Sequence, residues 1–350
     1  MTESSVQPMS ARFGRRVKRP GSGRIPVTIF TGFLGAGKTS LIRRLIETPQ
    51  GADTLIIVNE FGEIGFDQYV LSETGERAIL LGNGCLCCSV RTDLQETLRS
   101  FFVAKMKGTE TFRQVIIETS GLADPSPLLQ TFMTDRALAK EFHLRGLFSV
   151  VDAVNFPKEA NDHPLAQKQV ALSDCLIVSK CDVASSEEIR ETRERLSSAL
   201  AGRSIPILRA DEIDVETLLV HEVDAVAGKL DRIAEAVNHD ADISAFPIFF
   251  DQPLVWEAFV QAIRALIELR GPDLLRIKGL LAIENCEGPV VFHAVQHLVH
   301  DPVELSAWPD DDHRSRLIFI TRRIDPLQIK QLISAMTGLV PIADDGPRRA

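Results

Sequence analysis

The feature that most limits what this chain can fold into is the segment GFLGAGKT at residues 32–39, which matches the pattern GxxxxGK[ST]. It lies directly between a predicted strand at 25–30 and a predicted helix at 39–48, as that pattern requires. Glycines let backbone N–H groups wrap around phosphates, Lys38 brings a positive charge to the β- and γ-phosphate oxygens, and the Thr39 hydroxyl can bind Mg²⁺. The alternative is a glycine-rich turn without a ligand, which the strand–helix context disfavours. The predicted nucleoside triphosphate site consists of Gly32, Gly35, Ala36, Gly37, Lys38, Thr39 and Ser40.

Short β-branched runs alternate with longer helical patterns over the first part of the chain. Strands are predicted at 25–30, 54–59, 77–81, 114–120, 147–153, 175–179 and 205–210. Helices are predicted at 39–48, 90–105, 126–140 and 186–200. This alternation indicates βαβ units, and therefore an α/β fold of the P-loop NTPase type, with a mostly parallel sheet and helices on both faces. Ligands of such sheets bind at the carboxyl ends of the strands.

The pattern changes near the end of the chain, where several strands follow one another without helices between them. Strand-like runs occupy 246–250, 276–284, 289–298 and 316–324, and helices are predicted at about 253–269 and 326–337. This arrangement indicates a smaller α+β domain with an antiparallel sheet. The predicted organisation is a basic tail at 1–24, a nucleotide- and metal-binding domain at 25–220, a linker at 221–245, a C-terminal domain at 246–340 and a tail at 341–350.

Composition excludes several classes of function. The 350 residues are 45% hydrophobic and 25% charged, as in ordinary globular proteins. No apolar run approaches the roughly 20 residues that cross a bilayer, and the N-terminus lacks the apolar core of a secretory signal. The net charge of −9 opposes binding to nucleic acid phosphates. Residues 1–24 are basic but are interpreted as a solvated extension, so neither a membrane nor a nucleic acid is expected as a partner.

The segment SKCD at 179–182 follows a predicted strand and approximates the guanine-reading pattern NKxD. In that pattern the Asp carboxylate accepts hydrogen bonds from guanine N1–H and N2–H₂, and the Lys stem packs against the base plane. Asp182 is therefore the predicted guanine reader, with Lys180 beside it. Ser179 replaces the Asn of the pattern and is expected to lose one amide contact. An ordinary turn between a strand and a helix is the alternative.

A second strand end carries the segment ETSG at 118–121. It stands where P-loop GTPases sense the γ-phosphate, so the Gly121 N–H is a candidate phosphate ligand. Glu118 is a candidate catalytic residue that holds a Mg²⁺-bound water or polarises the attacking water. The alternative is an acidic residue that caps the next turn.

Three of the six cysteines, Cys85, Cys87 and Cys88, are packed into four positions between a predicted strand and helix. Thiolates are soft ligands that suit Zn²⁺, Cu(I) or Co²⁺. Three of them leave a tetrahedral site open, as a site that passes its metal to an acceptor requires. A redox pair and inert packing are the alternatives. The other cysteines, Cys175, Cys181 and Cys286, are interpreted as small apolar residues.

Five segments together resemble the CobW-like (G3E) family of metal-chaperone GTPases. They are GFLGAGKTS, VNEFGEIGFD at 58–67, GNGCLCC at 82–88, ETSGLADP at 118–125 and SKCD. The segments KGLLAIE, HAVQH and RSRLIFI near the end are similar to the CobW C-terminal domain. The resemblance covers about residues 25–340.

The resemblance implies a cytoplasmic, Mg²⁺-dependent GTPase that binds Zn²⁺, or a related ion such as Co²⁺, and passes it to a client metalloprotein. The roles that carry over are phosphate and Mg²⁺ binding, guanine recognition by Lys180 and Asp182, and metal binding by the three clustered cysteines. Glu60 and Asp67, in the segment similar to the first switch, become weaker candidate metal ligands. Two other functions stay open: a metal buffer that does not hydrolyse its nucleotide, and a small-molecule kinase.

A second metal site is suggested by His293, His297 and His300. The segment HAVQH falls in a predicted half-buried strand, where the first two histidines would be about 13 Å apart. The favoured interpretation is therefore that these are histidines on the polar face of a strand, and client docking or weak metal contact is the alternative.

Overall fold

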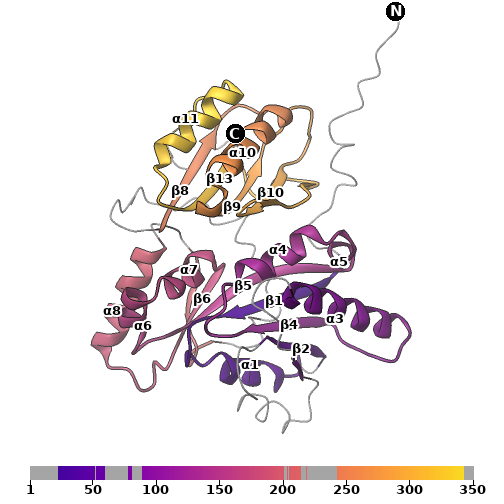
Figure 1. Cartoon of the computed structure of the whole chain (residues 1–350), viewed down its shortest axis with the longest axis vertical. Helices are drawn as coiled ribbons and strands as arrows, with labels where there is room; N and C mark the ends of the chain where they lie inside the picture. Colours follow the sequence, from indigo (N-terminus) through magenta and orange to yellow (C-terminus); the bar gives the residue numbers. More distant parts are fainter. Residues whose placement is uncertain are drawn as a thin grey trace, which may run out of the picture. The chain divides into compact units, whose positions relative to one another are not determined.

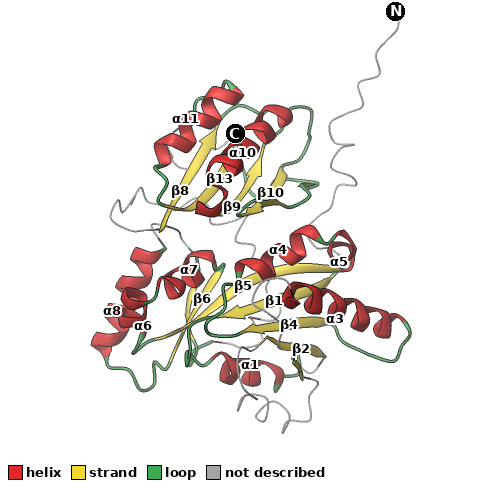
Figure 2. Ribbon diagram, viewed as in Figure 1, coloured by secondary structure: helices red, strands yellow, loops and turns green. Residues whose placement is uncertain are grey.

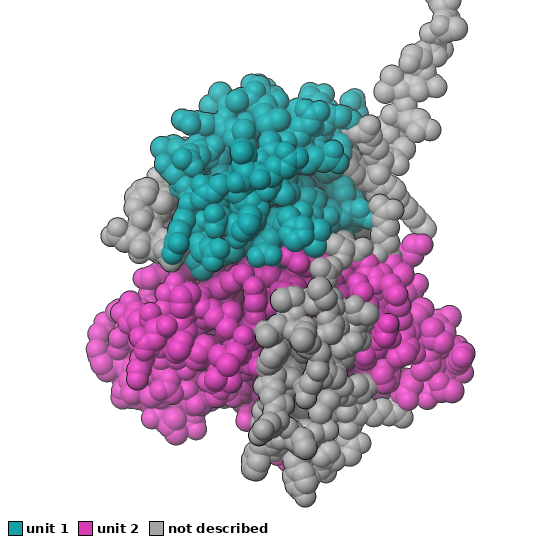
Figure 3. All heavy atoms as spheres, in the orientation of Figure 1, with its two compact units in different colours: residues 1–22, 201–204, 225–350 teal, residues 23–200, 205–224 magenta. Residues whose placement is uncertain are grey.

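The structure is a computed structural model that describes residues 23–51, 53–59, 78–80, 89–200, 203, 205–213, 218 and 243–342. The chain divides into two compact units. The first along the chain, magenta in Figure 3, is formed by residues 23–200 and 205–224, and the second, teal in Figure 3, contains residues 225–350. Each unit has its own sheet and its own hydrophobic core (Figure 1). The P-loop segment and the strand ends singled out above lie in the first unit.

In the described part of the first unit, seven strands form a parallel sheet in the order β3-β2-β4-β1-β5-β6-β7. The strands are β1 (Ile25–Thr31), β2 (Thr54–Asn59), β3 (Ala78–Leu80), β4 (Gln114–Thr119), β5 (Phe142–Asp152), β6 (Cys175–Ser179) and β7 (Ile207–Arg209). The central strand β1 pairs with β4 on one side and β5 on the other. Because all the strands run in one direction, their carboxyl ends share one edge of the sheet.

Helices cover both faces of this sheet (Figure 2). They are α1 (Lys38–Ile46), α3 (Ser89–Met106), α4 (Ser126–Thr134), α5 (Arg136–Glu141), α6 (Phe156–Asp162), α7 (Pro164–Leu172) and α8 (Ser186–Ala199). Side chains alternate along β6, so that Ile177 packs in the cluster that contains Leu41 of α1, and Val178 packs in the cluster that contains Leu196 of α8. The predicted α/β fold with both faces covered is confirmed.

Three details of the predicted elements were wrong. The helix predicted at 126–140 is broken at Asp135, whose backbone is extended and whose carboxylate accepts hydrogen bonds from the N–H groups of Ala137 and Leu138 at the start of α5. An N-cap of this kind starts a new helix rather than continuing the old one. Helices α6 and α7 were not predicted, and β5 begins at Phe142 instead of residue 147.

The second unit contains an antiparallel sheet in the order β11-β10-β9-β13-β8, with β12 paired to β10. Its strands are β8 (Ile243–Phe250), β9 (Leu274–Leu281), β10 (Val290–Val295), β11 (Leu298–Val299), β12 (Val303–Glu304) and β13 (Ser315–Arg322). Its helices are α10 (Trp256–Arg270), a short 3₁₀ turn η3 (Gly271–Asp273) and α11 (Pro326–Thr337). The predicted α+β character of this part is confirmed.

One row of side chains across this sheet shows how its core is built. Phe246, Phe319, Ile277 and Ala294 lie opposite one another on four neighbouring strands, and all are buried. The rings of Phe246 and Phe319 stack with centroids 5.7 Å apart. Apolar residues of α10 and α11 pack against this face. Among the described residues, no helix has the length and hydropathy to cross a membrane.

Candidate nucleotide-binding site

The loop between β1 and α1 has the backbone geometry that a phosphate-binding loop needs. Gly32, Gly35 and Gly37 have φ angles of 139°, 70° and 86°, which residues with a Cβ rarely adopt. A Cβ at Gly32 would also lie 2.1 Å from the carbonyl oxygen of Val150 on β5. Gly37 is the N-cap of α1 and offers no side chain to the first-turn N–H groups. Those N–H groups, with the positive end of the helix dipole, form the usual binding place for a phosphate.

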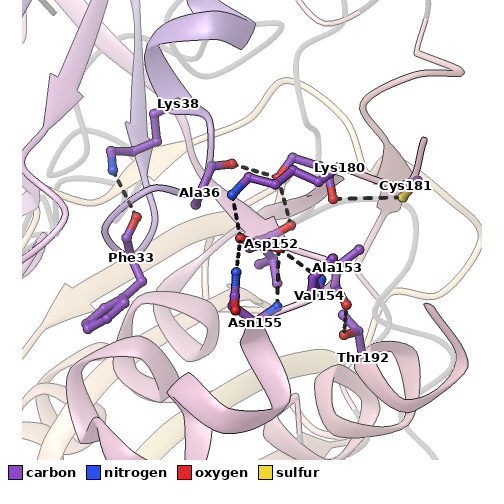
Figure 4. Close-up of polar contacts among 12 residues, drawn as sticks. Phe33, Ala36, Lys38, Asp152, Ala153, Val154, Asn155, Lys180, Cys181 and Thr192 are labelled. Carbon is purple, nitrogen blue, oxygen red and sulfur yellow. Dashed lines mark hydrogen bonds and ion pairs between the residues drawn. The ribbon is translucent and has the colours of Figure 1, made fainter. Parts of the chain in front are cut away.

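Lys38 is the first residue of α1 and folds back over its own loop. Its Nζ donates hydrogen bonds to the carbonyl oxygens of Gly32 at 3.0 Å and Phe33 at 3.2 Å (Figure 4 shows the contact with Phe33). The side chain is buried. A flexible ammonium that donates to carbonyl oxygens of its own loop can turn toward phosphate oxygens without leaving the loop.

Thr39 and Glu118 meet at the carboxyl edge of the sheet. Glu118 sits on β4 opposite Phe30 of β1, and its side chain is 5% exposed. The Thr39 hydroxyl donates its only proton to Glu118 Oε1 over 2.7 Å. The lone pairs of the Thr39 oxygen are therefore available to a cation, and hydroxyl and carboxylate oxygens are the hard ligands that Mg²⁺ prefers. These donors fit a magnesium ion.

The segment that follows Glu118 packs directly on the P-loop. A Cβ at Gly121 would lie 2.7 Å from the backbone of Leu34, so only glycine allows this approach. The buried Gln169 of α7 donates from Nε2 to the carbonyl oxygens of Gly121 and Ala123. Sequence reasoning missed this anchor, because α7 itself was not predicted.

Ser179 is the last residue of β6, and Lys180 and Asp182 follow it in the next turn. The Ser179 hydroxyl contacts the carbonyl oxygen of Ala36 in the P-loop at 2.6 Å and that of Val151 at 3.2 Å. The loss of one amide contact to the base stays a prediction, and the structure adds that the Ser179 side chain joins β6 to the P-loop. Asp182 is exposed in the turn after β6.

Lys180 is held by Asp152, a residue that sequence reasoning did not single out. Lys180 Nζ lies 2.7 Å from Asp152 Oδ2, and Asp152 ends β5, the strand next to β6 (Figure 4). Burial alone would raise the pKa of Asp152, but hydrogen bonds from Lys180, Asn155 and the backbone outweigh it and leave the pKa below its ordinary value. Asp152 is therefore an anion at neutral pH. Its only sequence signal was an Asp at a strand end, followed three residues later by Asn155.

Models of known families match both units. The model of the CobW/HypB/UreG nucleotide-binding domain matches residues 26–205, just over half of the chain and the stretch that contains the site described above. The chain belongs to the CobW/HypB/UreG family. The model of the cobalamin synthesis protein CobW C-terminal domain matches residues 243–337, which places the second unit in a CobW-type protein.

Several CobW-type relatives match over nearly their full length. The chain is 31% identical over 322 residues to the zinc chaperone YjiA of Escherichia coli, which covers 90% of this chain and 98% of that protein. It is 29% identical over 372 residues to the zinc chaperone CobW of Pseudomonas aeruginosa, covering 95% and 97% of the two chains. The crystal structure of the Zn(II)-bound YjiA GTPase from E. coli superposes with a TM-score of 0.68 at 25% identity, covering 89% of this chain and 99% of that one.

The predicted metal ligands of this CobW-type chain, Cys85, Cys87, Cys88, Glu60 and Asp67, lie outside the described residues. Within the residues that the structure does describe, no group of three or more His, Cys, Asp or Glu side chains is placed to hold a metal ion.

The remaining cysteines and histidines have other surroundings. Cys175 and Cys181 are buried, and burial raises the pKa of the Cys175 thiol to about 12, as expected for a small apolar residue. His293 lies on β10, where its Nε2 accepts a hydrogen bond from Arg276 Nε at 3.1 Å. His297 is exposed in the turn after β10 rather than on the strand that was predicted to hold both histidines.

Proposed function

We propose that this protein is a GTP-hydrolysing metallochaperone that binds Zn²⁺, or a related divalent ion, and delivers it to a client metalloprotein in the cytoplasm. The observation that carries the proposal is the contact of Thr39 with Glu118 beside an intact P-loop, in a chain that belongs to the CobW/HypB/UreG family. Its full-length relatives are zinc chaperones, and the solved relative is a Zn(II)-bound GTPase.

Hydrolysis depends on positioning and on charge compensation, because phosphoryl transfer needs little covalent chemistry from the protein. The P-loop N–H groups bind the phosphates, and Lys38 turns from its carbonyl partners to the β- and γ-phosphate oxygens. Thr39 and Glu118 would hold the magnesium ion, which supplies further charge neutralisation when it is bound. Glu118, near the end of β4, is also assigned to orient the attacking water, and the Gly121 N–H three residues later is assigned to the γ-phosphate.

Guanine recognition is assigned to the turn after β6. The exposed carboxylate of Asp182 accepts hydrogen bonds from guanine N1–H and N2–H₂, a donor pair that adenine lacks. The stem of Lys180, whose side chain is 39% exposed, packs against the base plane. The bond from Ser179 to Ala36 keeps this turn in register with the phosphate loop.

Metal binding is assigned to Cys85, Cys87 and Cys88, with Glu60 and Asp67 as weaker candidates. Thiolates suit Zn²⁺, and three of them leave one coordination position for a client ligand to enter. The segment that contains Glu60 and Asp67 separates the P-loop from the cysteines in sequence. Binding of the γ-phosphate to this segment would make the metal affinity depend on the bound nucleotide. Such a dependence distinguishes a metallochaperone from a metal buffer.

The test is a titration of Zn²⁺ into the full chain with a non-hydrolysable GTP analogue, with GDP and without nucleotide. Linkage requires that GTP raises metal affinity by the same factor as metal raises GTP affinity, and a factor of about 5 to 150 is typical. The gain should be lost in Cys85→Ala and Cys87→Ala and retained in Cys286→Ala, a control on the second unit. Equal Zn²⁺ affinities in all three nucleotide states would leave a metal buffer. Hydrolysis of ATP as fast as GTP would remove the guanine assignment.

A further inference from the structure

Lys180 adopts a backbone conformation that a long side chain normally avoids. Its φ angle is 57°, in the left-handed region, where a non-glycine residue costs about 1 kcal/mol or more. Backbone bonds hold it there, because the Lys180 carbonyl accepts from Ala184 N at 3.1 Å and the preceding Ser179 carbonyl accepts from Ala153 N at 3.0 Å. Such strain persists only where the surroundings determine it, and it is common at ligand sites.

The ammonium of Lys180 is fixed at its other end by a buried carboxylate. Asp152 is 1% exposed. Its Oδ1 accepts from the N–H groups of Val154 at 2.9 Å and Asn155 at 3.2 Å. Its Oδ2 accepts from Asn155 Nδ2 at 2.8 Å and from Lys180 Nζ at 2.7 Å. With four hydrogen bonds the carboxylate cannot turn, so it fixes the position of the lysine charge.

The turn that contains Lys180 is also attached to its surroundings on both sides of that residue. Ser179 is bound to the P-loop carbonyl of Ala36 at 2.6 Å. On α8, which follows the turn, the Thr192 hydroxyl donates to the carbonyl oxygen of Ala153 at 2.7 Å (Figure 4 shows this contact). The residue after Asp152 and the helix after Lys180 are therefore joined, which limits the movement of the Lys180 backbone relative to Asp152.

We propose that Asp152 is a positioning residue for base recognition: it holds Lys180 extended, so that the lysine stem forms a rigid wall of the base pocket. This inference rests on the proposed function, in which Lys180 and Asp182 read guanine. The ion pair neutralises the lysine charge at its tip and leaves the partly exposed methylene stem as the surface that meets the base. A pair with one partner 39% exposed adds little stability by itself, so holding the stem is the better reason for placing a carboxylate in a buried position.

The test variant is Asp152→Asn, which keeps the size of the side chain and removes its charge. The KM for GTP should rise about tenfold and kcat should change less than twofold, because the wall acts on the base and not on the phosphate. The stem meets the base plane and not its edge, so the KM for ITP should rise by the same factor. Asp182→Asn, which alters an edge contact, should instead change the ratio between GTP and ITP.

Asp135→Asn is the matched control. Asp135 is also buried, also caps two backbone N–H groups through Oδ1, and also pairs through Oδ2 with a partly exposed cation, Arg99, at 2.6 Å. It precedes α5, which leads into the amino end of β5, whereas Asp152 ends the same strand. Both variants should lower the melting temperature by a similar amount, and only Asp152→Asn should raise the KM.

A double-mutant cycle with Lys180→Met decides whether Asp152 acts through Lys180. Methionine keeps an apolar stem and removes the ammonium, so Asp152→Asn should change the KM less than twofold in this background. A tenfold effect that persists there, or no effect in the wild-type background, overturns the inference. If Lys180→Met and Asp182→Asn both leave the KM for GTP unchanged, the guanine site itself is wrong. If these two raise it and Asp152→Asn does not, only the positioning role fails.

Discussion

The two lysines of the site, Lys38 at the phosphate end and Lys180 at the base end, are held in different ways. Lys38 donates to carbonyl oxygens of its own loop, five and six residues before it in the sequence. Lys180 pairs with the carboxylate of Asp152, which lies on a neighbouring strand 28 residues away. Loop carbonyls carry only partial charges and release an ammonium easily, whereas a buried carboxylate retains it. The first lysine can therefore move to its ligand, and the second forms a fixed surface.

The same difference extends to the backbone. The phosphate end depends on glycines at positive φ and on helix N–H groups, which are properties of one continuous segment. The base end depends on the side-chain contact of Ser179 with Ala36 and on the ion pair of Asp152 with Lys180, which join three separate segments of the chain. A substitution at the phosphate end should therefore lower the rate of hydrolysis (kcat), and one at the base end should raise the KM for GTP.

The largest expected effect comes from Lys38→Ala. It removes the charge that compensates the developing negative charge on the phosphates, so kcat/KM for GTP should fall by about a hundredfold to a thousandfold or more. The bonds that Lys38 makes to Gly32 and Phe33 stay within one loop, and we expect the variant to remain folded, as checked by circular dichroism.

Lys158→Ala, on the exposed side of α6, is the control and should hydrolyse GTP like the wild type. If purified Lys38→Ala also keeps wild-type hydrolysis, the P-loop is not catalytic. If Lys38→Ala raises the KM and leaves kcat unchanged, the phosphate end affects nucleotide affinity rather than chemistry, which contradicts the contrast between the two ends.

This contrast also explains how much the sequence could predict. The P-loop, Glu118 and the parallel sheet follow from local patterns, because glycine spacing and runs of apolar residues are visible within a few positions. Helices α6 and α7 are only seven and nine residues long and each has a proline in its first turn, which leaves too few residues for a helical period to show. The partners of Gln169 and Asp152 depend on which strands become neighbours, so no local pattern revealed them.

One missed feature did have a local signal. Asp135 stands before Arg136 and a run of good helix formers, which is an N-cap pattern, but it lies inside a longer apolar stretch that read as one helix. Ser179 illustrates the opposite case. Comparison with a base-reading pattern suggested a lost contact, and only the position of Ala36 in space shows what its hydroxyl bonds to.

A smaller effect is expected from Ser179, which links the two ends. Ser179→Ala removes a buried hydrogen bond to Ala36, so the KM for GTP should rise about threefold to tenfold with little change in kcat. The hydroxyl has one proton for the carbonyl oxygens of Ala36 and Val151, whereas an amide has two N–H donors. Ser179→Asn should therefore keep the KM at or below the wild-type value.

Ser197→Ala is a suitable control for this series. The Ser197 hydroxyl donates to the Arg193 carbonyl oxygen within α8 and is exposed, so its loss should leave the KM unchanged. A wild-type KM in Ser179→Ala would show that this bond does not couple the phosphate end to the base end. The two ends would then contribute to nucleotide binding independently of each other.

The smallest expected effect concerns Glu159 of α6, whose charge interacts with those of both lysines. Burial and then the nearby Asp152 charge raise the pKa of Glu159 to about 7, against the opposing effect of Lys180 and Lys38. Between pH 4.5, the ordinary pKa of a glutamate, and about pH 7, Glu159 holds a proton in the folded protein that it has lost in the unfolded chain. This proton stabilises the fold at low pH, and the stabilisation is lost as pH rises through 7.

Glu159→Gln stays neutral at every pH, so the melting temperature of the variant minus that of the wild type should increase between pH 5 and pH 8. Solvent screening of this partly exposed group limits the increase to roughly 2 to 4 °C. If the melting temperatures of Glu159→Gln and the wild type change in parallel with pH, Glu159 is ionised throughout this range. Its protonation would then not link the phosphate end to the base end.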